Sequence, residues 1–148
     1  MSEITNYDPI KLENQLCFPL YACSKEIVRL YKPFLDELDL TYTQYLVMMA
    51  LWEYGCLSVK ELGEKLYLDS GTLTPLLKKL EAKGCLEKQR SSEDERSVLV
   101  KLMPFGEALK QKALEVPQAM ACKVSLPEEE AQVMYRLLYK ILGELHHK

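Results

Sequence analysis

A cysteine and two tyrosines near the N-terminus have the types and spacing to perform redox chemistry. Cys17 lies in the stretch ENQLCFPLYACSKEIVRLY (13–31), with Tyr21 four residues on and Tyr31 fourteen residues on. Phenol hydroxyls that donate hydrogen bonds to a sulfur stabilise the thiolate, which is the form of cysteine that attacks a peroxide. Apolar neighbours such as Phe18 would favour an organic substrate over a small polar one. The competing interpretation is that Cys17 is a buried cysteine acting only as a small hydrophobic residue.

The spacing of these three residues limits how they can meet. On a helix, a residue four positions on lies one turn along the same face, so Tyr21 could contact Cys17 within one chain. Fourteen positions return to nearly the same face, but at 1.5 Å per residue Tyr31 lies roughly 21 Å away. Tyr31 could therefore contact Cys17 only from a second chain.

A second set of residues is suited to contacting DNA. In LDSGTLTPLLKKLEAKG (68–84), leucines at helical spacing predict the buried face of a helix. Small, hydroxyl and basic residues at the N-terminal end of such a helix suit close approach to base edges and phosphates. A proline here costs little stability if it falls in the first turn, where backbone N–H groups lack partners. The candidates are Ser70, Gly71, Thr72, Thr74, Pro75, Lys78 and Lys79, and a solvated surface is the alternative.

Two arginines flank an acidic turn downstream of this helix. Arg90 and Arg96 lie on either side of a polar cluster that includes Asp94. An arginine on a narrow wing could enter a minor groove, with Asp94 bracing it through an ion pair. An ordinary surface salt bridge is the alternative.

These residues must be positioned by a mainly helical fold. We expect one helix over 10–39 with a kink at Pro19, because proline removes a backbone donor. Capping boxes at 41–44 and 58–61 predict two further helices, the first ended by Gly55 and the second reaching about 67. Asp69 or Ser70 would cap the leucine-striped helix, which Gly84 ends. The runs CLEKQR and RSVLVKL predict a β-hairpin, followed by a helix from 104 to about 122 and a last helix, capped by 125–128, through 145.

This order of elements is that of a winged helix-turn-helix. We predict a single domain, 1–148, that is mainly α with a small β-hairpin wing. Residues 41–103 would form the DNA-binding lobe. Residues 1–40 and 104–148 have apolar faces too large for that lobe to cover, so we expect them to be dimerisation helices in a homodimer. A helical bundle that happens to include a hairpin is the alternative.

Composition limits the cofactors and the compartment. The chain has 148 residues and no apolar run near the eighteen that a membrane span needs, and its N-terminus is unlike a secretory signal. We therefore expect a cytoplasmic protein without membrane association. Five cysteines without a CxxC pair, and two histidines adjacent at the C-terminus, predict no disulfide framework, no metal site and no cofactor. The net charge of −3 argues weakly against nucleic-acid binding, although 70–101 holds seven bases against five acids.

The chain resembles the MarR-type (multiple-antibiotic-resistance) repressors, and specifically their organic-hydroperoxide-sensing OhrR branch. The stretches LENQLCF, LTYTQYLVMMALWE, LGEKLYLDSGTLTPLLKKLE and DERSV carry the resemblance, which covers nearly the whole chain. It implies a homodimer that binds an inverted-repeat, double-stranded operator and represses a peroxidase gene. It also implies that an organic hydroperoxide oxidises Cys17 to a sulfenic acid, which releases the DNA. Tyr21 and the partner's Tyr31 match the tyrosines that bond the sulfur, and Tyr42 matches another lining the pocket; Pro19 departs from the family pattern.

A sulfenic acid usually condenses with a second thiol. Some relatives use a small cellular thiol, and others a cysteine of the partner chain near the end of the fifth helix. Cys122, in QAMACKVSL, occupies that region and is a possible resolving cysteine. Cys23 is a poorer candidate because it points away from Cys17, and Cys56 and Cys85 belong to the DNA-binding lobe. Resolution by Cys122 of the partner chain and resolution by a small cellular thiol both stay open.

Three other functions compete with a peroxide-sensing repressor. The first is a repressor that responds to a small aromatic ligand, with Cys17 merely buried. The second is a thiol peroxidase, which usually needs a charged activator near the thiol. The nearest cations, Lys11 and Lys25, share no helical face with Cys17, so we expect no enzyme. The third is a protein-interaction module, which the resemblance of the leucine-striped helix disfavours.

Overall fold

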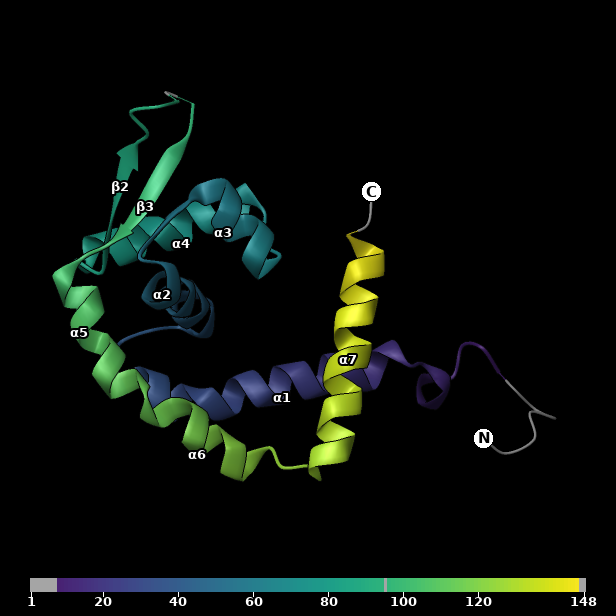
Figure 1. Cartoon of the computed structure of the whole chain (residues 1–148). Coiled ribbons are helices and arrows are strands. Elements are labelled where there is room, and N and C mark those ends of the chain that lie inside the picture. The colour runs from purple at the N-terminus through teal and green to yellow at the C-terminus, as the bar shows by residue number, and fades with distance from the viewer. Residues whose placement is uncertain (1–7, 95, 147–148) are drawn as a thin grey trace.

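The computed structural model describes residues 8–94 and 96–146 (Figure 1). Its N-terminal part is a short 3-10 helix, η1 (Leu12–Asn14), followed by α1 (Cys17–Asp36). The expected single helix over 10–39 with a kink at Pro19 is therefore wrong. Pro19 is the third residue of α1, where a missing N–H breaks no intrahelical bond. The correction places Cys17 at the very start of a helix.

The next three helices begin at the predicted caps. In α2 (Tyr42–Tyr54) and α3 (Val59–Leu66), the capping boxes of Thr41 and Ser58 are complete, and Gly55 ends α2 with a φ of 77°. Asp69 caps α4 (Ser70–Ala82) by accepting a hydrogen bond from the Thr72 N–H at 2.7 Å. Since α3 and α4 are joined by a short turn, they form the expected helix-turn-helix.

The wing is a three-stranded antiparallel sheet. The predicted hairpin is present as β2 (Leu86–Arg90) and β3 (Val98–Leu102). A third strand, β1 (Cys56–Ser58), pairs with the other side of β3, giving the order β1-β3-β2. β1 was not predicted from the sequence, because three residues between a glycine and a helix cap are too few to show strand alternation.

The leucine stripe of α4 forms the centre of the lobe. Each of its four leucines is at most 9% exposed, and they pack with α2, α3 and the sheet. Burying a leucine contributes about 1.5–3 kcal/mol. The stripe thus fixes α4 in the lobe with its opposite face outward. The buried leucines are Leu73, Leu76, Leu77 and Leu80.

The chain after the wing contains three helices, where two were expected. A break at Leu114 separates α5 (Pro104–Ala113) from α6 (Glu115–Lys123). Pro117 explains it, because the ring of a proline clashes with the carbonyl four residues earlier, here Ala113. The last helix, α7 (Glu128–Leu145), has Pro127 as its N-cap and no side-chain cap, so the cap predicted at 125–128 is wrong.

The two terminal segments present apolar surface to solvent. α6 packs along α1, whereas α7 projects from the end of α6 (Figure 1), and just after its C-terminal end the ring of His146 lies 4.9 Å from that of Tyr67, measured between centroids. None of the residues of α7, all of which are described, is buried, and Tyr135 and Leu145 are each 65% exposed. Leu16, at the start of α1, is 76% exposed. Within 8–94 and 96–146 no helix combines the length and apolar character needed to cross a bilayer.

Candidate redox site and nucleic-acid interface

Cys17 is the first residue of α1 and is exposed in the single chain. Its preceding residue, Leu16, gives no side-chain cap, so N–H groups of the first turn lack side-chain partners. A helix N-terminus carries partial positive charge and favours a negatively charged group, such as a thiolate. The apolar spacing predicted a longer helix with Cys17 inside it, so this feature was not expected from the sequence.

Tyr21 lies one turn along α1 from Cys17 and is 63% exposed. Among the described residues no hydrogen bond joins it to the Cys17 sulfur. Lys25, expected to share no helical face with Cys17, has its Nζ 5.5 Å from the centroid of the Tyr21 ring. This cation–π contact is made with the tyrosine and not with Cys17, so it leaves that expectation unchanged.

Three tyrosines cluster at the other end of α1. The ring of Tyr31 lies 4.9 Å from that of Tyr42 and 5.9 Å from that of Tyr45, measured between centroids. Burial raises the pKa of Tyr42 above its usual value, and the nearby Tyr31 adds to the shift. The pKa of Tyr45 is raised for the same reasons, with Tyr42 contributing. Both phenols thus remain protonated hydrogen-bond donors near neutral pH.

Tyr45 was not singled out from the sequence. It is 3% exposed and also packs edge-on against Trp52, at 6.3 Å between centroids. Its spacing of three residues from Tyr42 on the same helix could have indicated that the two rings share a face. Tyr45 therefore belongs to the core, whereas Tyr31 and Tyr42 are half-buried and pack against it.

The redox residues do not meet within one chain. Cys17 and Tyr31 both belong to α1, so fourteen residues of helix hold them roughly 21 Å apart, as the spacing predicted. Cys122 is exposed near the end of α6. Its neighbour Lys123 has its Nζ 6.0 Å from the ring of Phe34, which lies seventeen residues, or roughly 25 Å, along α1 from Cys17. A disulfide needs Cα atoms within about 7 Å, which this arrangement does not offer inside one chain.

The remaining cysteines lie away from this site, and no disulfide joins any of the five. Cys23 is exposed on α1, Cys56 is exposed at the start of β1, and Cys85 is buried between α4 and β2. Burial raises the pKa of the Cys85 thiol, which keeps it protonated and unreactive. Within the described ranges, no group of three or more His, Cys, Asp or Glu is arranged to hold a metal ion.

The outer face of α4 presents the predicted DNA-contacting residues. Thr74 donates its hydroxyl hydrogen to the Ser70 carbonyl at 2.8 Å, which leaves its oxygen able to accept a bond from a base. Pro75 is the sixth residue of α4, so it lies inside the helix rather than in the first turn. Its missing N–H leaves the Gly71 carbonyl without its helical partner. Ser70, Gly71, Thr72, Thr74, Pro75, Lys78 and Lys79 are all exposed.

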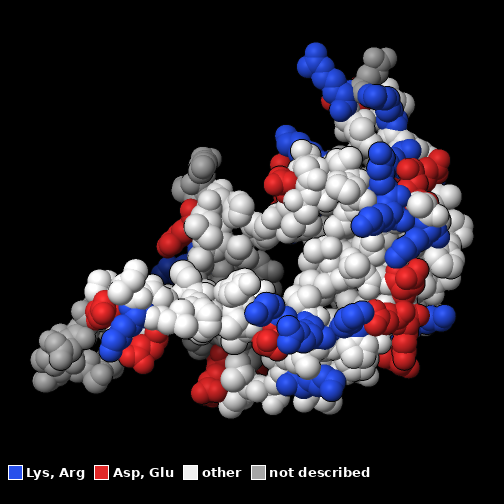
Figure 2. Space-filling view, turned by 180° about the vertical axis from the view of Figure 1, so that it is seen from behind, with Lys and Arg blue, Asp and Glu red and all other residues white. Residues whose placement is uncertain are grey.

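The wing and α4 enclose a cleft of about 490 Å³, lined in part by Thr74, Asp94 and Arg96. Asp94 does not form an ion pair with Arg96 in the described structure; its Oδ1 accepts the Arg96 backbone N–H at 3.0 Å. The carboxylate thus shapes the turn, and the exposed guanidinium of Arg96 extends from it. Figure 2 shows basic side chains at the wing tip and down the adjoining side of the lobe, with acidic ones between them. Arg90, at the end of β2, is also exposed.

Comparisons with known proteins agree with this architecture. The sequence profile described as "Transcriptional regulator SarA/Rot" matches residues 29–113. The chain is 49% identical over 142 residues to the "Organic hydroperoxide resistance transcriptional regulator" of Bacillus subtilis, covering 96% of this chain and 97% of that protein.

Two solved proteins share the fold. Reduced AbfR bound to DNA is 33% identical with a TM-score of 0.77, covering 90% of this chain and 94% of that one. The disulfide form of AbfR, a protein of Staphylococcus epidermidis, gives a TM-score of 0.65 at 32% identity. The match covers 88% of this chain and 92% of that one. A mutant of Escherichia coli MarR complexed with operator DNA is 28% identical with a TM-score of 0.76, covering 92% and 99%.

Proposed function

We propose that this chain, which belongs to the MarR family of winged-helix transcriptional regulators and to its organic-hydroperoxide branch, senses organic hydroperoxides through Cys17 and then releases its operator. The chain is a DNA-binding transcriptional regulator like its relatives, and not an enzyme. The observation that carries the proposal is the exposed Cys17 at the start of α1, while the donor tyrosines lie roughly 21 Å along the helix, so that only a second chain can bring such donors to it.

A homodimer would complete this site. If two α1 helices packed antiparallel, Cys17 of one protomer would lie beside Tyr31 and Tyr42 of the other. The exposed apolar residues of α1 and α7 supply surface for such packing, since a solvated helix does not otherwise keep an apolar face. Tyr21 would complete the set from the same chain as Cys17.

The oxidation is a two-electron reaction at sulfur. The Cys17 thiolate attacks the outer peroxide oxygen, the O–O bond breaks, and the alkoxide leaves as an alcohol after taking a proton. Sulfur is oxidised to the sulfenic acid while the hydroperoxide is reduced. Phenol donors would hold the thiolate, and the apolar side chains of Leu16 and Phe18 would favour an organic peroxide substituent.

The sulfenic acid would then condense with a second thiol, releasing water. We propose the partner's Cys122 for this step, because its exposed position near the end of α6 leaves it accessible and the pairing within one chain is too distant. Peroxide-treated protein on a non-reducing gel should run as a covalent dimer that disappears in Cys17→Ser and in Cys122→Ser. A monomer that gains the mass of an added small cellular thiol would contradict the assignment of Cys122.

The dimer would present two α4 helices to successive major grooves of an inverted repeat, about 34 Å apart. Phosphates would be contacted by Lys78 and Lys79 of α4, and the minor groove by the wing residues Arg90 and Arg96. Thr74 would contact base edges. Such a repressor of a peroxide-resistance gene acts in the cytoplasm.

The direct experiment is operator binding with and without an organic hydroperoxide. A labelled fragment of the chain's own upstream DNA is titrated by fluorescence anisotropy before and after cumene hydroperoxide. Wild type should lose affinity, Cys17→Ser should bind but not respond, and Cys23→Ser, the matched exposed cysteine on α1, should respond normally. Release of Cys17→Ser by peroxide as readily as wild type would show that another group is the sensor. Release of that variant by an aromatic ligand alone would favour a ligand-responsive repressor.

A further inference from the structure

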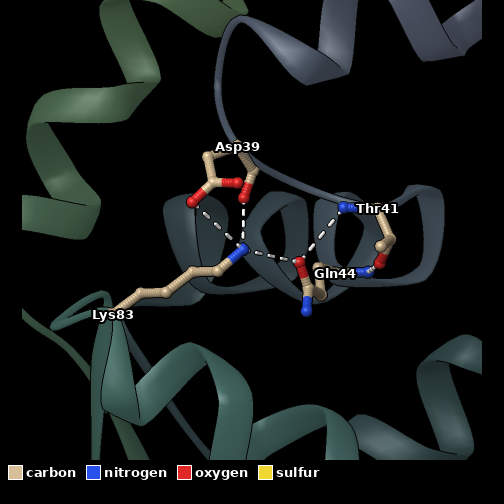
Figure 3. Close-up of polar contacts among 4 residues, drawn as sticks. All are labelled: Asp39, Thr41, Gln44 and Lys83. Atoms are coloured by element: carbon tan, nitrogen blue, oxygen red, sulfur yellow. Dashed lines mark hydrogen bonds and ion pairs between the residues drawn. The ribbon is translucent and has the colours of Figure 1, made fainter.

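The side chain of Lys83 joins the end of α4 to the junction between α1 and α2 (Figure 3). Lys83 is the C-cap residue of α4, and its side chain is 29% exposed. Its Nζ donates to the backbone carbonyl of Asp39 and, at 3.3 Å, to Gln44 Oε1, and it lies 3.6 Å from Asp39 Oδ2. The ammonium group therefore donates two hydrogen bonds, and the Asp39 carboxylate adds an ion pair.

Both partners of Lys83 are held in place by other contacts. Asp39 has a φ of 55°, in a turn that the Leu40 N–H closes by donating to the Leu35 carbonyl at 3.0 Å. Leu35 and Leu40 are buried. Gln44 is 4% exposed, and its Oε1 also accepts the Thr41 N–H at 3.1 Å. The ammonium thus binds a rigid junction rather than a mobile loop.

The same junction supports the tyrosine cluster. Thr41 and Gln44 form the capping box of α2, and Tyr42 is the residue between them that begins the helix. The ring of Tyr42 packs on Tyr31 of α1. A continuous set of contacts therefore runs from the tyrosines through the cap of α2 to Lys83 and the end of α4.

We propose that Lys83 is a positioning residue that couples the redox site to the recognition helix α4, because its contact stabilises the DNA-binding arrangement. This inference rests on the proposed function. The chain matches the DNA-bound reduced form of AbfR at a TM-score of 0.77, another AbfR crystal structure at 0.76 and the disulfide form at 0.65, so the contact is seen in an arrangement closer to the first two than to the disulfide form. A contact made in one of two arrangements shifts the equilibrium between them and leaves the other arrangement unaffected.

The test compares operator affinity in both redox states for wild type and Lys83→Met. Methionine keeps the apolar stem of the side chain, and Gln44 retains its bond from Thr41, so the variant leaves no buried acceptor unpaired. The reduced variant should bind operator about fivefold more weakly, the size of one partly screened charge-assisted hydrogen bond. After treatment with cumene hydroperoxide, the affinity of the variant should stay within about twofold of the wild-type value. The response ratio, which is the operator affinity of the reduced protein divided by that of the treated protein, therefore falls about fivefold.

Two matched variants separate coupling from general loss of charge. Lys83→Arg keeps the donors and the charge and should restore most of the ratio. Lys32→Met removes an exposed lysine that pairs with Asp36 at 3.0 Å on α1, and should leave the ratio unchanged. The salt dependence of Lys83→Met should match wild type, because Lys83 faces protein acceptors rather than DNA.

Equal weakening in both redox states would overturn the inference, since it would make Lys83 a structural or phosphate-contacting residue. An unchanged reduced affinity would overturn it as well. If wild type itself failed to respond to the hydroperoxide, the proposed function would fall instead, which distinguishes the two failures.

Discussion

Replacing Lys78 by alanine tests the assignment of α4 to DNA binding in a quantitative way. Lys78 is exposed on the outer face of α4, and the ion pairs found among the described residues do not include it. Its charge is therefore available to a phosphate. Each phosphate contact changes the slope of log K against log salt by about 0.9 for B-DNA, so loss of two such lysines in a dimer should flatten the slope by about 1.8.

The assay is fluorescence anisotropy of the reduced protein on its operator at salt concentrations between about 50 and 200 mM, the range over which phosphate contacts change affinity steeply. The matched control is Lys32→Ala, which removes an exposed, paired lysine from α1 and should leave the slope unchanged. A slope change of about 0.9 would indicate one recognition helix per bound DNA and contradict the dimer. An unchanged slope would refute the orientation of α4 toward DNA.

Three further predictions follow from other parts of the structure. Tyr31→Phe keeps the ring packing on Tyr42 but removes a phenol donor, so Cys17 oxidation measured by stopped flow should slow about tenfold while reduced operator binding is unchanged. The pKa of Tyr42 is raised on folding, so its contribution to stability is present below about pH 10 and is lost as the pH rises further. In urea unfolding, the free energy of unfolding of Tyr42→Phe should therefore fall less steeply than that of wild type between about pH 9 and 11. Gly106→Ala would press a Cβ against the backbone carbonyl oxygen of Cys85 and should destabilise the protein by more than about 2 kcal/mol, whereas Gly143→Ala, with nothing within 4 Å of the added Cβ, should stabilise α7 by about 0.5–1 kcal/mol.

Local signals in the sequence predicted most of the DNA-binding lobe. A capping box specifies the residue at which a helix begins, so α2 and α3 begin where expected, and the Asp69 cap does the same for α4. The leucine stripe of α4 fixes which face of that helix is buried. The terminal helices were predicted less well. A proline kinks a helix when it lies in the interior but is tolerated in the first turn, and Pro19 lies in the first turn of α1. The helical spacing of apolar residues continues upstream of Cys17, so it did not reveal where α1 begins.

Features that depend on distant parts of the chain could not be predicted. β1 exists because β3 supplies a partner forty residues later, and its own three residues carry no strand pattern. The contact of Lys83 with Asp39 joins residues 44 positions apart, and a lysine at the end of a helix otherwise suggests only a solvated charge. The contact of Tyr45 with Tyr31 of α1 is a second such case, although its spacing from Tyr42 and Trp52 on α2 was a local signal that could have placed the three rings on one face.

The most direct test of the account is whether Tyr31 acts on the cysteine of the other chain. Two mixed dimers, each with a single Cys17, are prepared with differently tagged chains. In the first, a Cys17→Ser chain pairs with a Tyr31→Phe chain, so the remaining Cys17 receives Tyr31 from its partner. In the second, wild type pairs with a chain carrying both substitutions, so the remaining Cys17 faces Phe at position 31 of its partner. The account predicts that cumene hydroperoxide oxidises Cys17 about tenfold faster in the first dimer than in the second; equal rates, or a faster second dimer, would contradict a redox site completed between two chains.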